Sequence, residues 1–403
     1  MEITLRDGIH WVGVIDWNLR EFHGYEIRRG TTYNAYLVID EKTALIDTVR
    51  APFGQELIEK LGALTPLDRI DYVVCNHAEP DHAGSLPAIM RACPNATLVC
   101  DAKCKEELSA FFDTSAWRFR VVASGESLSL GKRTLQFHAT PMVHWPESMA
   151  TYVPEEKLLF SMDAFGQHVA DSARFDDESE LDVVFEEAKH YYANILMPFG
   201  RPIGRTLDAL SALPIELVAP SHGVIWRRHF ADILKAYRAW TAFKPAARVV
   251  VIYDSMWGST EVMARAVVEG ATIPGVAVEL RHLRKNAMSD VVTALLDAPC
   301  IALGSATQNN SLMPQVGALR TYLGGLKPER KAGFFFTSYG WSRKATSDEA
   351  KGLFEALKIQ ELHAPILSLF TPTAEVLAEC RAAGRALAEE ALRQAKEQTQ
   401  GEG

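Results

Sequence analysis

Apolar residues follow different patterns in the two parts of the chain. In the first 245 residues, short β-rich runs alternate with polar segments, and several runs end in a histidine or an acidic residue. The runs predict strands at residues 32–39, 43–48, 72–77, 157–163 and 216–223. Chemically active side chains are therefore concentrated where strands stop.

The first part ends in a predicted helix. Residues 230–243 have amphipathic spacing, and the KPAA segment after them contains Pro245, which would end a helix. We therefore place a domain boundary there, with one domain at residues 1–245 and the other at 246–403.

The second part alternates strands with helices. Near-continuous apolar runs predict strands at residues 248–254, 276–280, 300–304, 332–337 and 366–370. Such strands, joined by helical crossovers, indicate a buried parallel sheet in a doubly wound α/β domain. A final helix is predicted after Thr373, and the polar tail beyond about Gln394 is expected to fray.

Composition and charge narrow the choice of partners and location. The formal net charge is -9, which argues against a nucleic-acid partner because phosphate binding needs clustered Lys and Arg. The first residues lack the apolar stretch of a secretory signal, and no long uncharged apolar run follows. We therefore expect a cytoplasmic protein with no membrane segment. The six cysteines lack CxxC spacing and are expected to be reduced and mostly buried.

The segment NHAEPDHAG contains four residues of the types that bind metals, His77, Glu79, Asp81 and His82. It follows an apolar strand and precedes a helix expected near Ser85. A loop at a strand end can turn several side chains toward one point, so this density of imidazole and carboxylate predicts metal ligation.

Further candidate ligands follow other β-like runs. They are His144 in MVHWPES, Asp163 at the end of KLLFSMD and His222 in APSHG. With the NHAEPDHAG residues they make seven ligand-type side chains, about the number that two metal ions sharing a bridging carboxylate require. Other histidines lack such context and are interpreted as structural or solvated: His10, His138, His190, His229, His282 and His363.

Loops at the ends of strands in the second part predict a phosphate-containing ligand. The first loop, SMWGST, precedes a helix whose backbone N–H groups and dipole would favour a phosphate. Two further loops end the third and fourth strands, so all would line one crevice at the carboxyl edge of the sheet. The predicted binding residues are Ser255, Met256, Trp257, Gly258, Ser259, Thr260, Ser305, Ala306, Thr307, Gln308, Asn309, Asn310, Ser338, Tyr339, Gly340, Trp341 and Ser342.

The metal-ligand pattern resembles the metallo-β-lactamase fold as modified in flavodiiron proteins, and the second domain resembles flavodoxin. Ordinary hydrolases of that fold carry a histidine where this chain has Glu79. A carboxylate ligand suits iron, whereas a site rich in imidazole suits zinc. The whole order resembles class A flavodiiron proteins. The implied fold is an N-terminal αββα sandwich followed by a flavodoxin-like parallel sheet.

This resemblance implies two iron ions and an FMN, and it assigns roles to residues. His77, Glu79 and His144 would bind one iron, Asp81, His82 and His222 the other, and Asp163 would bridge them. His82 is the ligand that varies within the family. His23 and Tyr25 would lie near the open side of the site as candidate proton donors or gates, and Trp341 would stack on the flavin ring.

The implied activity is reduction of O2 to water, of NO to N2O, or of both, with O2 slightly preferred. The resemblance also implies a head-to-tail homodimer, or a dimer of such dimers, that brings the FMN of one chain to the iron site of the other. Because the chain has no rubredoxin-like CxxC pair, electrons would come from a separate donor. A rubredoxin is the expected donor, and a reduced deazaflavin coenzyme is the alternative.

Two other interpretations remain open at this point. One is a zinc hydrolase with an accessory flavodoxin-like domain, against which Glu79 and the flavin loops argue. The other is an electron carrier with a degenerate first domain, although every ligand position is filled. Ala306, where the family pattern has proline, would loosen its loop, and the positive charge of Arg343 and Lys344 would favour an anionic reduced FMN or an acidic donor.

Overall fold

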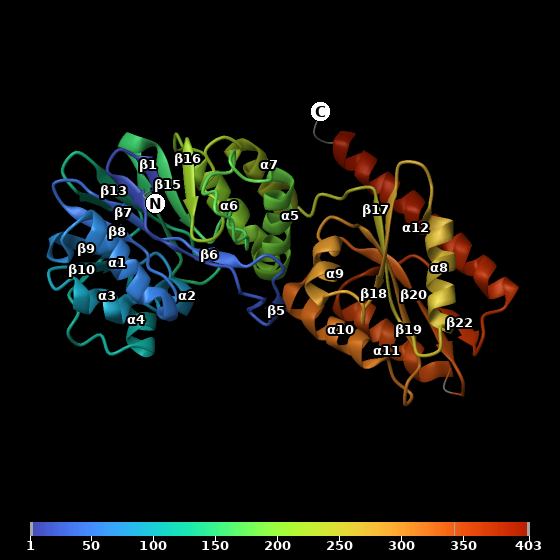
Figure 1. Cartoon of the computed structure of the whole chain (residues 1–403). Helices are drawn as coiled ribbons and strands as arrows, with labels where there is room; N and C mark the ends of the chain where they lie inside the picture. The colour runs from blue at the N-terminus through green and yellow to red at the C-terminus, as the bar shows by residue number, and fades with distance from the viewer. Residues whose placement is uncertain (1–2, 342, 401–403) are drawn as a thin grey trace. The chain divides into compact units, whose positions relative to one another are not determined.

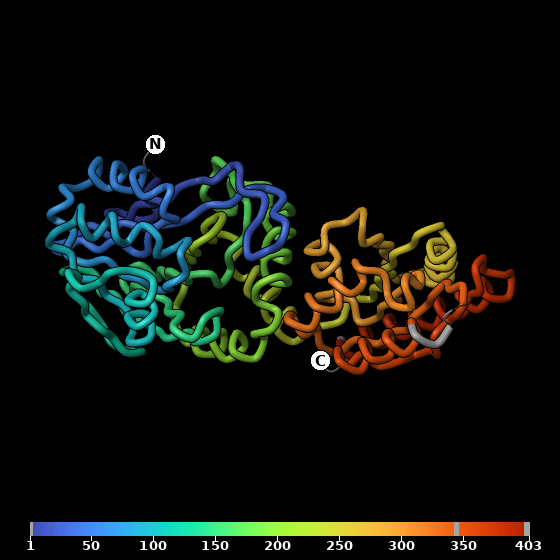
Figure 2. The backbone as a smooth tube through the Cα atoms, turned by 90° about the horizontal axis from the view of Figure 1, so that it is seen from below, coloured from blue at the N-terminus to red at the C-terminus, as the bar shows by residue number. Residues whose placement is uncertain are grey.

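The computed structural model describes residues 3–341 and 343–400. The chain forms two compact units, one of Met1–Tyr191 with Phe199–Arg238 and one of Tyr192–Pro198 with Ala239–Gly403. The division falls within helix α7 (Phe230–Thr241), a few residues before the predicted boundary. Figure 2 traces the backbone as a tube, coloured from blue near the N-terminus to red near the C-terminus.

The first unit is a sandwich of two sheets. The seven-stranded sheet has the order β1-β2-β7-β8-β9-β10-β11 and the five-stranded sheet the order β12-β13-β14-β15-β16. Two short pairs, β3 with β6 and β4 with β5, stand apart from them. The strands are β1 (Ile3–Arg6), β2 (Ile9–Trp11), β3 (Val14–Asp16), β4 (Glu21–Phe22), β5 (Tyr25–Glu26), β6 (Thr31–Tyr33), β7 (Tyr36–Val38), β8 (Thr43–Ile46), β9 (Ile70–Val74), β10 (Thr97–Cys100), β11 (Phe119–Val121), β12 (Ser127–Ser129), β13 (Thr134–Ala139), β14 (Met149–Val153), β15 (Leu158–Met162) and β16 (Leu217–Pro220).

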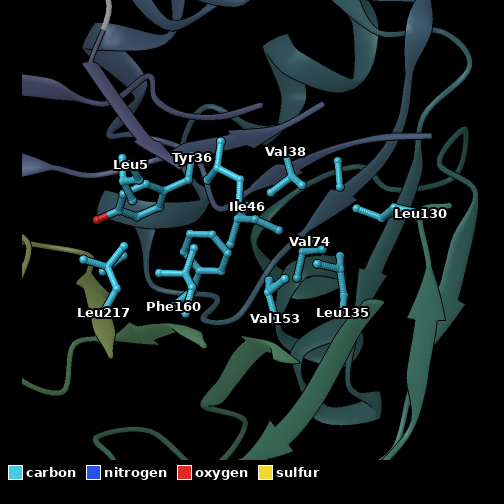
Figure 3. Close-up of a cluster of buried hydrophobic side chains, with 14 of the residues drawn as sticks. Leu5, Tyr36, Val38, Ile46, Val74, Leu130, Leu135, Val153, Phe160 and Leu217 are labelled. Carbon is cyan, nitrogen blue, oxygen red and sulfur yellow. The ribbon is translucent and has the colours of Figure 1, made fainter. Parts of the chain in front are cut away.

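Apolar side chains from both sheets meet between them and form a continuous core. Tyr36, Ile46 and Val74 come from the seven-stranded sheet, and Phe160 and Leu217 come from the five-stranded sheet (Figure 3). Because these residues alternate with outward-facing ones along short strands, burial of one face fixes the register of each sheet. The core holds rigid the strand ends from which the candidate ligands project.

Helices cover the outer faces of the sandwich. Those after β8, β9 and β10 pack apolar residues against the seven-stranded sheet in a second core cluster. Those that follow β15 and β16 lie on the side of the five-stranded sheet (Figure 1). The helices are α1 (Gly54–Leu64), α2 (Pro80–Ala83), α3 (Leu86–Ala92), α4 (Ala102–Phe111), α5 (Leu181–Tyr191), α6 (Gly200–Leu210) and α7 (Phe230–Thr241).

The strand predicted at residues 32–39 is wrong as a single element. The structure divides it into β6 and β7, which belong to different sheets. Asn34 lies at the break, where its side-chain amide donates to the carbonyl oxygens of Pro220 at 2.9 Å and Gly223 at 3.1 Å. Asn34 thus links the chain at this break to the end of β16 and to the loop after it. A long-range contact of this kind cannot be recognised from a local sequence pattern.

The second unit is a parallel sheet of order β18-β17-β19-β20-β21, with β22 also paired to β20. This is the 2-1-3-4-5 order of flavodoxin-like sheets, in which ligands bind at the carboxyl ends of the strands. The αββα sandwich and the doubly wound sheet predicted from the sequence are therefore both confirmed. The strands are β17 (Arg248–Asp254), β18 (Ala277–His282), β19 (Cys300–Ala306), β20 (Ala332–Tyr339), β21 (Gln360–Glu361) and β22 (Ile366–Leu369).

Helices α8 and α12 pack closely side by side on the sheet of the second unit (Figure 1). The helices are α8 (Ser259–Ala271), α9 (Met288–Leu295), α10 (Pro314–Leu326), α11 (Arg343–Ala356) and α12 (Ala374–Gln400). The expected fraying beyond Gln394 is wrong, since α12 continues to Gln400. Arg393 donates to Glu390 and Glu397, and such pairs at helical spacing stabilise a polar last turn.

All six cysteines are buried and free, as expected. Among the residues that the structure describes, no helix has the length and apolar character needed to cross a bilayer.

Candidate metal centre and flavin pocket

The first group of candidate ligands gathers at the carboxyl ends of β9 and β15. His77, Glu79, His144 and Asp163 each offer one ligand atom, and these atoms all lie within 4.8 Å of one another. The Nε2 atoms of His77 and His144 lie 3.3 and 3.2 Å from Glu79 Oε2. All four residues are buried. Side chains from three separate loops therefore converge on one point.

A second group lies beside the first. Asp81 and His82 belong to the short helix α2, and His222 follows β16. The Nε2 atoms of His82 and His222 both lie 3.2 Å from Asp81 Oδ2. The structure thus brings together all seven residues that the sequence singled out as metal ligands.

The carboxylate of Asp163 lies between the two groups, and its two oxygens face opposite ways. Oδ2 lies 3.3 Å from His144 Nε2 and 3.5 Å from His77 Nε2. Oδ1 lies 3.3 Å from His82 Nε2 and 3.6 Å from His222 Nε2. One oxygen toward each group is the geometry that a carboxylate bridging two cations needs.

Neighbouring groups fix the orientation of the candidate ligands. His77 Nδ1 lies 2.5 Å from Glu147 Oε1, and His222 Nδ1 lies 2.7 Å from the backbone oxygen of Thr32. An imidazole whose Nδ1 donates a hydrogen bond presents an unprotonated Nε2 to a metal. Ser221 Oγ donates to Asp163 Oδ1 at 2.7 Å. The Glu147, Thr32 and Ser221 contacts were not predicted from the sequence.

Several atoms of the site have no protein hydrogen-bond partner among the described residues. These buried atoms are both carboxylate oxygens of Asp81, both ring nitrogens of His82, Nε2 of His144 and Oδ2 of Asp163. Burying unpaired polar atoms is unfavourable unless something else satisfies them. These atoms belong to two carboxylates and two imidazoles of a site with three carboxylates and four imidazoles in all, a ligand set that fits two divalent cations and whose carboxylate share suits iron.

The electrostatics of the site favour the same conclusion. Burial would lower the pKa of His77, but the Glu147 and Glu79 carboxylates more than offset burial and raise this pKa well above its usual value. Burial would raise the pKa of Asp163, yet the His82 charge and the nearby His144 imidazole hold it well below its usual value. The acids of the site thus favour positively charged neighbours and the imidazoles favour negatively charged ones, a charge pattern suited to bound cations.

The proposed proton donors lie at different distances from the centre. His23 Nε2 lies 2.5 Å from Glu79 Oε1, directly beside the first group. The ring of Tyr25 lies farther out, with its centroid 6.4 Å from that of His168. The sequence prediction omitted His168, although its ring lies 4.9 Å from that of His222. His168 follows the predicted ligand Asp163 by five residues, and this short distance in the sequence could have indicated a position near the site.

The second unit carries a cavity of about 760 Å³ at the carboxyl ends of β17, β19 and β20. The N-terminus of α8 lies beside it, and this segment contributes three of the lining residues, Met256, Trp257 and Ser259. The side chains of Trp257 and Trp341 are 93% and 89% exposed, so each offers a free aromatic face. A cleft with an anion-favouring helix end and aromatic faces suits a ligand that has a phosphate and a flat ring.

Most of the predicted flavin residues line this cavity. The predicted residues that line it are Met256, Trp257, Ser259, Ala306, Thr307, Asn309, Asn310, Ser338, Tyr339, Gly340 and Trp341. Ser255, Gly258, Thr260, Ser305 and Gln308 do not line it, and Ser342 lies outside the described residues. Thr260 Oγ1 lies 2.8 Å from Ser338 Oγ and ties the first loop to the third.

Phe370 and Thr371 also line the cavity but were not predicted. They follow β22, whose loop contains no glycine, unlike the loops that were predicted to bind the ligand. Strand order, rather than local composition, brings this loop to the cavity.

Comparisons with known proteins agree with this architecture. A model of the ODP family of beta lactamases matches residues 31–223, and a flavodoxin model matches residues 251–391. The nitric oxide reductase of Moorella thermoacetica is 45% identical over 391 residues, which cover 96% of this chain and 98% of that protein.

Solved structures extend the likeness to three dimensions. The flavodiiron protein from Giardia intestinalis superposes with a TM-score of 0.96 at 36% identity, covering 99% of this chain and 98% of that chain. The rubredoxin oxygen:oxidoreductase from Desulfovibrio gigas superposes with a TM-score of 0.95 at 36% identity, covering 98% and 99%. Both cover the sandwich and the parallel sheet together.

Proposed function

The chain belongs to the flavodiiron proteins, and we propose that it reduces dioxygen and nitric oxide at the Asp163-centred metal site with electrons that pass through FMN. It is an oxidoreductase whose cofactors are FMN and two iron ions. When bound, the flavin and the irons supply the electrons that both reductions need.

We propose the ligand assignment implied by the resemblance. His77, Glu79 and His144 would hold one iron, and the group of Asp81, His82 and His222 the other. The observation that carries this assignment is the position of Asp163, which directs one oxygen toward each group. A site for a single zinc ion would leave one of these groups, and its unpaired buried atoms, without a function.

The flavin would occupy the cavity at the end of the parallel sheet. Its phosphate would lie at the N-terminus of α8, where Ser259 and Thr260 begin the helix. Trp341 would stack on the ring. We also propose that the hydroxyl pair of Thr260 and Ser338 holds the phosphate loop in place.

The electron donor and the assembly are further parts of the proposal. A rubredoxin is the proposed donor, and the name of the Desulfovibrio relative supports it. A reduced deazaflavin coenzyme is the alternative. The proposed assembly is a head-to-tail homodimer, alone or paired into a tetramer, in which the flavin of one chain serves the metal site of the other.

The preference between the two gases stays a prediction. The relative that is 45% identical is named a nitric oxide reductase, whereas the structure from Desulfovibrio is named for oxygen. Both reactions use the same ligands, and we predict slightly faster reduction of dioxygen.

The test uses protein purified without oxygen and analysed for metal and flavin. Two irons and one FMN per chain are expected, and the fully reduced protein should be reoxidised rapidly by dioxygen or by nitric oxide in a stopped-flow instrument. Asp163→Ala should keep FMN and its reduction but lose gas reduction by more than about a hundredfold, because ligand loss costs more than the loss of an outer partner.

Asp113→Ala is the matched control, since Asp113 is exposed in the loop after α4. It should reoxidise at the wild-type rate. Zinc in place of iron would support the hydrolase, and equal reoxidation of wild type and Asp163→Ala would support the simple electron carrier. Either result would overturn the proposal.

A further inference from the structure

Helix α5 buries two ionisable side chains away from the candidate metal ligands. Glu187 and His190 are each 1% exposed, and they lie on one face of the helix because they are three positions apart. Glu187 Oε2 has no hydrogen-bond partner among the described residues, and His190 Nδ1 lies 4.0 Å from it. A buried carboxylate oxygen without a hydrogen-bond partner is uncommon in a purely structural helix.

The outer end of this pair is in contact with charges that reach solvent. Glu187 Oε1 lies 3.1 Å from Arg28 Nη2 and 3.1 Å from Arg29 Nε. The side chains of Arg28 and Arg29 are 30% and 45% exposed, and both also pair with Glu186, which is 49% exposed. The carboxyl group of Glu187 is therefore one side chain away from water.

The inner end leads toward the metal site through aromatic side chains. The His190 ring lies 5.6 Å from the ring of Tyr25, and Tyr25 lies 6.4 Å from His168. The His168 ring lies 4.9 Å from that of His222, a candidate iron ligand. Tyr25 and His168 are buried, so this succession crosses the protein interior.

His168 can serve as the last member of the series. Its Nδ1 lies 2.8 Å from Thr31 Oγ1, which holds the ring in place. Its Nε2 has no hydrogen-bond partner among the described residues. Phe22 packs against the rings of both His168 and His23, so His168 borders the same space as the residue that contacts Glu79.

We propose that Glu187, His190, Tyr25 and His168 form a proton relay from the surface at Arg28 and Arg29 to the proposed di-iron site. The inference rests on the proposed function, because that chemistry consumes protons. Reduction of O2 with four electrons takes up four protons and releases two waters, and reduction of two NO with two electrons takes up two protons and releases N2O and one water.

The acid–base properties of the outer groups support such a role. Burial raises the pKa of Glu187 to about 7, and Arg28 and Arg29 offset this only in part while Glu186 adds to it. Burial, together with the Arg28 charge, lowers the pKa of His190 to about 4. A carboxyl group with a pKa near neutral can both release and regain a proton at working pH. Steps longer than a hydrogen bond would use side-chain rotation or a bridging water.

The test compares Glu187→Gln with Glu186→Gln in the iron- and FMN-loaded protein. The control removes the same charge beside the same two arginines, but from an exposed position. Wild type should lose gas-reduction rate as the pH rises through about 7, because Glu187 deprotonates, and the control should keep this step at a somewhat lower pH, because it lacks the Glu186 charge. Glu187→Gln should be at least about tenfold slower below pH 7 and should lack this pH step, in line with the size of general acid effects.

Two further measurements separate a relay from a structural role. His190→Gln leaves the Glu187–arginine pairs intact and should slow gas reduction as Glu187→Gln does, with unchanged iron and FMN content. In metal-free protein, infrared titration should show a carboxylic acid band that disappears near pH 7 in wild type and at a somewhat lower pH in Glu186→Gln but is missing in Glu187→Gln.

Rapid wild-type turnover with an unchanged rate and pH profile in both Glu187→Gln and His190→Gln would overturn the relay and leave the proposed function intact. Loss of iron or FMN from both variants would assign the residues a structural role and would also overturn it. Failure of wild type itself to reduce either gas would instead contradict the proposed function.

Discussion

Glu147 shows how much a single buried side chain outside the ligand motif can matter. It accepts a hydrogen bond from His77 Nδ1 at 2.5 Å and another from the backbone of Ala78 at 3.0 Å. These contacts fix the tautomer and the orientation of His77. The carboxylate is fully buried, so water cannot replace it.

Glu147→Gln should therefore weaken iron binding by about ten- to a hundredfold, the usual cost of losing an outer partner of a ligating histidine. Competition with a chelator of known affinity measures this change. Glu106→Gln, at an exposed position on α4, should behave as wild type. Equal iron affinity in Glu147→Gln and wild type would show that Glu147 does not orient His77.

Trp341 belongs to the flavin cavity and is 89% exposed without its ligand. Covering one indole face with the flavin ring should contribute about 1 to 2 kcal/mol, so Trp341→Ala should raise the FMN dissociation constant roughly tenfold. Quenching of flavin fluorescence measures the constant. Trp17→Ala is a control, because Trp17 is an exposed tryptophan in the first unit. If Trp257→Ala shows the loss and Trp341→Ala does not, the first loop provides the stacking face instead.

For single residues, the sequence indicated the candidate metal ligands but not the residues that hydrogen-bond to them and hold them in place. His77, Glu79, Asp81 and His82 are dense in the chain, so their chemistry was visible as a motif. Glu147 bonds a residue 70 positions away, and no spacing rule connects the two. Supports of this kind depend on the tertiary fold, which is why the sequence missed them.

Among the elements, the first turn of α8 has the greatest consequence for ligand binding. Gly258 caps this helix with φ +91° and ψ -15°, and its N–H donates to Ser255 Oγ at 3.1 Å. A Cβ added at Gly258 would meet no atom within 4 Å, so any cost of substitution is conformational rather than steric. Residues other than glycine and asparagine adopt this region only with strain.

Gly258→Val should therefore distort the loop and raise the FMN dissociation constant roughly tenfold, the equivalent of about 1 to 2 kcal/mol of strain. Gly258→Asn should cost clearly less, since asparagine tolerates positive φ. Titration of FMN into apoprotein measures both variants. Equal affinity of the valine and asparagine variants would show that the backbone conformation of this turn does not limit binding.

Helices α8 and α12 approach so closely that glycine is required at two positions. A Cβ on Gly270 would lie 1.9 Å from the backbone oxygen of Arg381, and one on Gly384 would lie 2.1 Å from that of Val267. Overpacking of this kind typically costs about 1 to 3 kcal/mol. The helix pair supports the strands that present the flavin loops, so its packing matters for the second unit as a whole.

Gly270→Ala and Gly384→Ala should each lower the melting temperature of the second unit by about 4 to 8 °C, the shift expected for about 2 kcal/mol in a domain of this size. Gly324→Ala is the matched control, because Gly324 is exposed on α10 and its added Cβ would meet no atom within 4 Å. That change should be neutral or slightly stabilising. Calorimetry of the full chain measures all three, and equal melting of Gly270→Ala and Gly324→Ala would contradict the packing argument.

Element prediction succeeded best where strands are buried on both faces. β17 spans the predicted residues 248–254, because a buried parallel strand is a continuous apolar run. β21 contains only two exposed residues, Gln360 and Glu361, and left no signal. In the first unit many strands are short and were not predicted, since three or four alternating residues resemble loops.

The whole molecule consists of two units with separate hydrophobic cores and separate candidate ligand sites. The metal-ligand groups lie entirely in the first unit, and the flavin cavity lies entirely in the second. The sequence predicted this separation, because the residues that bind metals occur in the first part of the chain and the loops expected to bind a phosphate occur in the second. Arrangement of the two units, by contrast, depends on surface complementarity that leaves no periodic trace in a single sequence.

Each cofactor should therefore stabilise its own unit. A ligand that binds only the folded state at about a hundred times its dissociation constant adds about 2.7 kcal/mol, which corresponds to roughly 5 to 10 °C for a domain of this size. Removing iron with a chelator should lower the transition of the first unit by this amount and leave the second unchanged. Removing FMN should have the opposite pattern. Anaerobic calorimetry of the full chain measures both transitions.

Asp163→Ala identifies which transition belongs to the metal site, because a chelator should no longer shift any transition in that variant. Trp341→Ala should likewise reduce the effect of FMN on the second transition alone. A single transition that moves under both treatments would mean that the units unfold as one cooperative body. The two hydrophobic cores would then not unfold independently of each other. The prediction that each cofactor stabilises only its own unit would be wrong.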